Sequence, residues 1–70
     1  MTELADVGRK VRDRRKSLAL TQDDLADLAR CSPRFVRALE AGKPSVRLDK
    51  LRDVLDVLGL ELDVTPRRKP

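Results

Sequence analysis

The most restrictive feature of this sequence is a pair of helix-start signals in close succession, one at Thr21 and one at Ser32. Thr21 is a good N-cap residue, and Asp24 stands at the third position after it, as in a capping box. Ser32 is also a good N-cap, and the Pro33 that follows is favoured at the first helical position. The chain between the two caps has room for one short helix and a tight turn.

The first of these helices is expected over residues 22–29. Its apolar residues recur at helical spacing and predict a buried stripe of Leu25, Leu28 and Ala29. The second helix is expected over residues 33–41, because Gly42 favours a helix end and Pro44 prevents continuation.

Only Arg30 and Cys31 separate the first helix from the cap of the second. Two helices this short and this tightly joined must cross at a steep angle, which is the helix-turn-helix arrangement. The second helix of that motif enters the major groove of DNA with its N-terminal residues toward the base edges.

The second helix has two chemically different faces. At about 100° per residue, one side gathers Phe35, Val36 and Leu39. The opposite side gathers Arg34, Arg37, Ala38 and Ala41. Two arginines with only small residues between them can approach another surface closely, and a guanidinium fork suits O6 and N7 of guanine. In this context we expect Arg34 and Arg37 to read bases, although in an arbitrary helix they would be a solvated face.

Composition favours a binding protein over an enzyme. Sixteen Lys and Arg against twelve Asp and Glu give a net charge of +4, which suits a polyanionic partner. The chain has no His and one Cys, and its three glycines form no phosphate loop. We therefore expect no catalytic residue, no metal ligand, no cofactor and no small-molecule substrate.

The single cysteine and the hydropathy pattern bear on location. Cys31 cannot form an internal disulfide, so a reducing cytoplasm is the natural compartment. We interpret Cys31 as a buried hydrophobic residue rather than a redox switch. No apolar run approaches the ~18 residues of a membrane span, and the N-terminus lacks the apolar core of a signal peptide.

Two further helices and a short extended segment complete the expected domain. A basic amphipathic helix is expected at about residues 3–17, and a later one carries an apolar stripe made of Leu48, Leu51, Val54, Leu55 and Leu58. Gly59 ends that helix, and residues 60–65 then alternate apolar and polar as in a strand, although an extended loop would fit as well. Residues 1–65 form the expected domain, and residues 66–70 a basic disordered tail.

From Val7 to Leu58 the chain resembles the lambda-repressor-like, or XRE-type, helix-turn-helix family. The resemblance is carried by Arg15, by Leu20-Thr21-Gln22-Asp23-Asp24-Leu25-Ala26, and by Ser32, Val36, Leu39-Glu40 and Gly42-Lys43. It implies base contacts from Pro33, Arg34, Arg37 and Ala38. It also implies phosphate contacts from Gln22, Ser32 and Lys43, and an ion pair between Arg15 and Glu40.

Arg30, Pro33 and Cys31 depart from the family pattern, and Cys31 replaces a small apolar residue. Arg30 stands where the family usually has Gly, and a positive φ there costs on the order of 1 kcal/mol. Either the turn differs or this cost is accepted. Pro33 has no amide donor, so base recognition depends more on Arg34 and Arg37.

The second half, GKPSVRLDKLRDVLDVLGLELDVTP, resembles the HipB-like antitoxin subgroup. That resemblance implies a dimeric repressor that binds its own operator and a HipA-like kinase toxin. A strand at residues 60–65 would have no mate in its own chain, so a second copy is its natural partner. The interface would contain Val57, Leu60, Leu62 and Val64.

The sequence therefore predicts an all-α helix-turn-helix domain of four helices with one short C-terminal strand that pairs across a homodimer. The expected function is repression through a near-palindromic operator on double-stranded DNA, as an antitoxin. Two alternatives remain: a phage-type or restriction-modification controller repressor without a toxin, and a protein-interaction module with incidental DNA binding.

Overall fold

The computed structural model describes residues 4–63, which form four α-helices. The helices are α1 (Leu4–Ser17), α2 (Gln22–Ala29), α3 (Pro33–Glu40) and α4 (Leu48–Leu58). The expected all-α helix-turn-helix architecture is confirmed, and each helix begins and ends within about a residue of its expected bounds.

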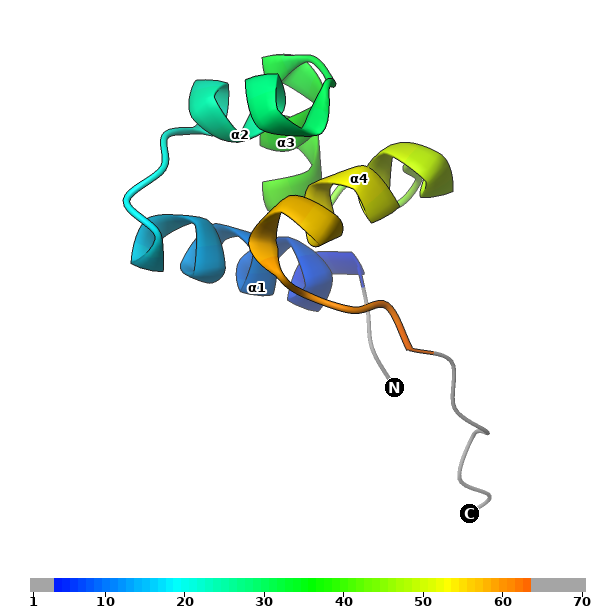
Figure 1. Ribbon diagram of the computed structural model, residues 1–70. Coiled ribbons are helices and arrows are strands. Elements are labelled where there is room, and N and C mark those ends of the chain that lie inside the picture. Colours follow the sequence, from blue (N-terminus) through cyan, green and yellow to red (C-terminus); the bar gives the residue numbers. More distant parts are fainter. Residues whose placement is uncertain (1–3, 64–70) are drawn as a thin grey trace.

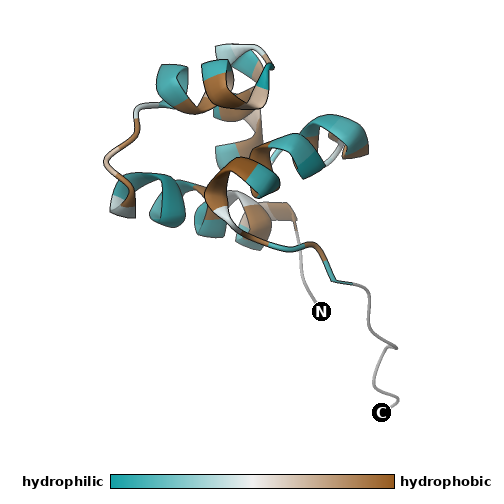
Figure 2. Cartoon of the chain, viewed as in Figure 1, coloured by the Kyte–Doolittle hydropathy of each residue, from teal (hydrophilic) through white to brown (hydrophobic). Residues whose placement is uncertain are grey.

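The helices surround one small core. In Figure 1, α1 lies below, α2 and α3 lie above it, and α4 crosses beside them. Helix α3 packs against α1 and α2, and α4 packs against the same two helices. The largest fully buried side chains are Val11, Leu25, Val36, Leu39, Val54 and Leu58. Figure 2 shows that hydrophilic and hydrophobic residues alternate along the helices.

Helix starts follow the predicted caps. Thr21 Oγ1 accepts a hydrogen bond from the Asp24 amide at 3.0 Å, and Asp24 Oδ2 accepts one from the Thr21 amide at 2.9 Å. Ser32 Oγ accepts from the Phe35 amide at 3.0 Å, and Pro33 occupies the first turn of α3. These side chains satisfy amides that would otherwise lack a partner inside the helices.

Each helix is followed by a residue with a left-handed backbone conformation, which means a positive φ. This residue is Gly42 after α3 and Gly59 after α4. After α1 and α2 it is Ala19 and Arg30, both with φ of 57°. Arg30 therefore adopts the conformation that the family provides with Gly, and the chain accepts the cost of about 1 kcal/mol. The same strain at Ala19 was not expected from the sequence.

Two leucines assigned to apolar stripes are instead exposed: Leu28 and Leu48, both at 58%. The buried residues of α2 are Leu25, Ala26 and Ala29. Because Ala26 belongs to this buried face, Leu28 lies outside it. Leu48 is the first residue of α4, where no preceding turn covers it. The assignment of Leu28 and Leu48 to the core was wrong.

The segment after α4 has no regular secondary structure over Leu60–Asp63, and no strand occurs within residues 4–63. A strand that pairs only with a second copy has no hydrogen-bonding partner in a single chain, so the strand remains a prediction. Val64, Thr65 and the tail at 66–70 lie outside the described residues.

Candidate nucleic-acid interface

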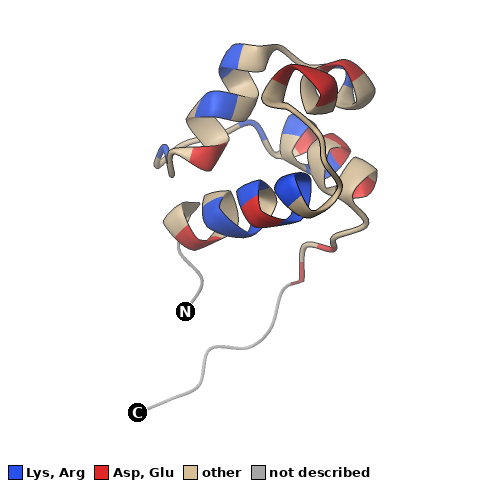
Figure 3. Ribbon diagram, turned by 90° about the vertical axis from the view of Figure 1, so that its left-hand side faces the viewer, with Lys and Arg blue, Asp and Glu red and all other residues tan. Residues whose placement is uncertain are grey.

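The outer face of α3 presents its arginines without partners. Arg34 and Arg37 are exposed, and neither side chain makes a hydrogen bond or ion pair within residues 4–63. Val36 and Leu39, on the other side, are 0% and 1% exposed. The division into faces that the sequence predicted therefore holds, and Figure 3 shows the basic bands along α3.

The first turn of α3 contains no acidic residue, although the positive end of a helix dipole favours one. Arg34 stands there instead, against the dipole. Pro33 and Ala38, which the family resemblance places at base-facing positions, are both half-buried. The charged groups available to an outside partner on this face are thus Arg34 and Arg37.

The C-terminal end of α3 is held by a bidentate ion pair. Arg15 of α1 donates from Nε to Glu40 Oε2 at 2.7 Å and from Nη2 to Glu40 Oε1 at 3.0 Å. The two side chains are only 10% and 5% exposed. Arg15 Nη1 also donates to the Leu20 carbonyl at 2.7 Å, so it joins α1, the loop before α2 and α3. The pair implied by the family resemblance lies at the centre of this connection.

Electrostatics favour the charged form of both partners. Burial acts to raise the pKa of Glu40, but hydrogen bonds from Arg15 and Gln22, with the charges of Arg15 and Arg12, bring it below its ordinary value. The hydrogen bond to Glu40 raises the pKa of Arg15, against the effect of burial.

Close backbone packing reinforces this end of α3. A Cβ on Gly8 of α1 would collide with the carbonyl oxygen of Leu39, and it would lie 3.0 Å from that of Glu40. A Cβ on Gly42 would come within 3.0 Å of the Ala5 Cα, and Gly42 has φ of +80°. Glycines at both positions let α1 lie directly against the end of α3.

The residues implied as phosphate contacts have different surroundings. Gln22 Nε2 donates to Glu40 Oε1 at 3.1 Å, so one amide hydrogen of Gln22 is already engaged. Ser32 caps α3 through its hydroxyl. Lys43 is exposed directly after α3, and its amide donates to the Ala38 carbonyl at 3.1 Å.

A basic hollow of about 430 Å³ lies between α1 and α3, lined by Arg12, Arg15, Lys16, Gln22, Arg37 and Glu40. The sequence marked α1 as basic but did not assign Arg12 and Lys16 to the interface. The spacing of these two residues could have indicated their role. Like charges four residues apart destabilise a helix by ~0.2–0.5 kcal/mol unless an opposite charge neutralises them.

Cysteine and metal chemistry do not contribute to this face. Burial raises the pKa of the Cys31 thiol, and Cys31 packs against the core as a small apolar residue. No group of three or more potential metal ligands is present among the described residues. No helix within residues 4–63 is both long enough and apolar enough to span a membrane.

Comparison with known proteins agrees with this geometry. The helix-turn-helix domain family matches residues 6–67. The chain belongs to the helix-turn-helix family. It is also 45% identical over 60 residues to a protein of Sinorhizobium fredii described as "Uncharacterized HTH-type transcriptional regulator y4mF". That alignment covers 86% of this chain and 79% of the relative. Both findings agree with the XRE-like resemblance that the sequence suggested.

Proposed function

We propose that this chain is a sequence-specific DNA-binding transcriptional regulator that acts as a repressor. The observation that carries the proposal is the outer face of α3, the helix that enters the major groove in this motif, where the side chains of Arg34 and Arg37 are exposed and have no partner within residues 4–63. The printed description of the relative as a transcriptional regulator is consistent with it. That the chain acts by binding rather than by catalysis is part of this proposal.

The experiment is selection of duplexes from a random DNA pool by the full chain, followed by titration of the selected and a scrambled duplex at several salt concentrations. We expect a near-palindrome with half-sites about one helical turn apart, ~34 Å. Affinity should fall steeply with salt and should drop on the scrambled duplex. Equal affinity for all sequences would favour the protein-interaction alternative.

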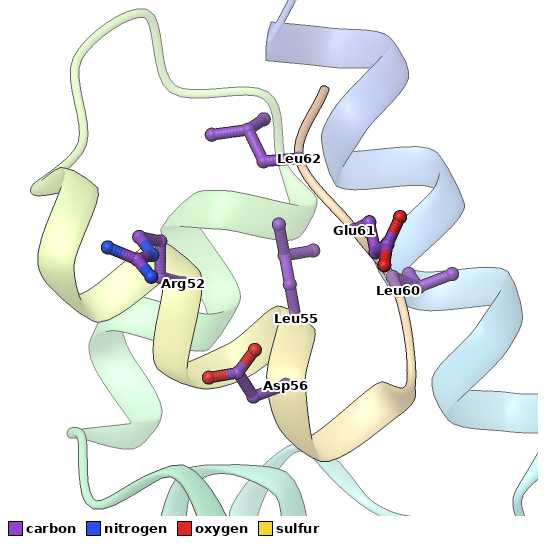
Figure 4. Close-up of a pocket in the computed structure, with 6 residues that line it drawn as sticks. All are labelled: Arg52, Leu55, Asp56, Leu60, Glu61 and Leu62. Carbon is purple, nitrogen blue, oxygen red and sulfur yellow. The ribbon is translucent and has the colours of Figure 1, made fainter. Parts of the chain in front are cut away.

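We further propose that the chain acts as a homodimer joined through residues 60–65. Leu62 is 46% exposed, whereas Leu60 and Val57 are half-buried against the core of the same chain. In Figure 4, Leu62 and Leu55 lie on one side of the C-terminal segment, and Leu60 lies on the side of α1. The groove there has a volume of about 250 Å³ and is open to a second copy.

Truncation after Gly59 tests the dimer. Helices α1 to α4 are complete at that point, so the shortened chain should remain folded by circular dichroism. Sedimentation equilibrium at micromolar concentration should then give a dimer for the full chain and mostly monomer for the truncated chain. A truncated chain that remains a tight dimer and binds operator normally would place the interface elsewhere.

The antitoxin role is the most specific part of the proposal. It rests on the resemblance of the segment from Gly42 to Pro66 to HipB-like antitoxins, and it requires a HipA-like kinase as partner. The adjacent reading frame is the direct test: co-expression and co-purification with a kinase-like neighbour would support the role. A neighbouring phage or restriction gene would instead favour a plain repressor or controller.

A further inference from the structure

Helix α1 places two unpartnered cations one turn apart beside α3. Arg12 and Lys16 are both exposed and line the basic hollow, and their side chains make no hydrogen bond or ion pair within residues 4–63. Other arginines of α1 are engaged: Arg9 pairs with Asp6, and Arg14 donates to the Leu58 carbonyl at 2.9 Å. The repulsion between Arg12 and Lys16 is therefore not offset by a hydrogen bond or ion pair of either side chain within residues 4–63.

The hollow has an excess of positive charge. Arg15 and Glu40, its two buried charged side chains, form a tight pair and neutralise each other. Arg12, Lys16 and Arg37, which also line it, are exposed cations. The charge of Arg12 already acts at this place, since it helps to lower the pKa of Glu40. An anion entering the hollow would meet cations from two helices.

The amino end of α2 lacks this charge. Asp23 and Asp24 occupy its first turn, and the hydrogen bond from the Thr21 amide lowers the pKa of Asp24, which keeps that carboxyl charged. The Gln22 side chain, one position earlier, is neutral and donates to Glu40. A phosphate at this end of α2 would gain amide hydrogen bonds but would also meet two carboxylates.

We propose that the hollow between α1 and α3 holds a phosphate of the DNA backbone, and that Arg12 and Lys16 supply the charge of this contact. The inference rests on the proposed function and identifies the residues of its sequence-independent part. Gln22 orients the phosphate through its remaining amide hydrogen. Arg37, which shares the hollow and the outer face of α3, lies between the phosphate and the bases.

The test is the salt dependence of binding for Arg12→Ala and Lys16→Ala, with Lys10→Ala as the matched control. Lys10 is an exposed cation of the same helix that does not line the hollow. Each hollow variant should lower the slope of log K against log salt by about one unit. Each should also weaken binding several-fold on the selected and the scrambled duplex alike. Lys10→Ala should leave the slope unchanged.

A fold control accompanies the titrations. Lys16→Ala removes the repulsion from Arg12 and should not lower the melting temperature of the protein, and Arg12→Ala should lower it only slightly, because Arg12 also attracts the Glu40 carboxylate. Slopes for Arg12→Ala and Lys16→Ala equal to that of Lys10→Ala, while wild type still prefers its selected duplex, would overturn the phosphate site and leave the proposed function standing. A wild-type protein with no sequence preference and no salt slope would overturn both.

Discussion

The two ends of α3 are held in opposite ways. At the C-terminal end, Glu40 accepts hydrogen bonds from Arg15 and Gln22, and Gly8 brings α1 into direct contact with the backbone. At the N-terminal end, Ser32 caps the helix, and the side chain of Arg34 has no partner within residues 4–63. One end is bound to two other helices, and the other presents free donors.

This difference separates positioning from recognition. A reading helix must be rigid relative to the contacts that place it on DNA, and its reading groups must stay unpaired until the DNA arrives. The C-terminal end provides rigidity through buried charge and close packing. The N-terminal end is less stable than it could be, because the cation Arg34 lies near the amino end of the helix, where the helix dipole disfavours positive charge.

The largest expected effect comes from breaking the fixed end. Glu40→Ala leaves Arg15 buried without its partner and should lower the free energy of unfolding by about 3–5 kcal/mol. The double replacement Arg15→Met with Glu40→Leu should lower it much less, since no buried charge remains. Urea unfolding of Arg15→Met, of Glu40→Leu and of the double variant measures the coupling energy between the two side chains. Additive effects would mean that the pair does not hold this end.

The second-largest expected loss of stability comes from disturbing the close backbone packing at the C-terminal end of α3. Gly8→Ala puts a methyl group against the Leu39 carbonyl and should force α1 away from α3. We expect a loss of about 1–3 kcal/mol, typical of overpacking. Thermal unfolding measures it, with Ala5→Gly as a control for packing under Gly42. An unchanged melting temperature for Gly8→Ala would contradict the close contact.

The pH dependence of stability reports on the same carboxylate. The folded-state pKa of Glu40 is below its ordinary value, so its contribution is fully present above an unfolded pKa of about 4.3. It is lost as the pH falls through the folded pKa, because the unfolded chain then binds more protons than the native one. Urea midpoints between neutral and acid pH should fall for wild type and fall less for Glu40→Gln. Parallel curves would exclude Glu40 as the source.

The smallest expected change in stability comes from a replacement at the N-terminal end of α3. Arg34→Glu places an acidic residue in the first turn of α3 and should raise stability by about 0.3–1 kcal/mol while abolishing DNA binding. Asp23→Arg in the first turn of α2 should lower stability by a similar amount. Thermal unfolding of the two variants compares the helix starts directly. A loss of stability in Arg34→Glu would mean that Arg34 contributes to the fold.

Much of the fold followed from local chemistry. The caps at Thr21 and Ser32 set two helix starts, and the pattern of α3 placed Val36 and Leu39 inside and both arginines outside. Leu28 was misplaced because, in a helix of eight residues, one small residue such as Ala26 decides which side packs. The hollow could not be predicted, since it depends on how α1 crosses α3 in space.

The most direct test of the proposed recognition is sequence discrimination by the outer face of α3. The ratio of dissociation constants for the selected and scrambled duplexes is measured for wild type, Arg34→Ala and Arg37→Ala, with Lys43→Ala as the control. The account predicts that each arginine variant loses about 1–3 kcal/mol of discrimination, while Lys43→Ala weakens both duplexes alike. Equal weakening of both duplexes by Arg34→Ala and Arg37→Ala would reduce these arginines to phosphate contacts and contradict the account.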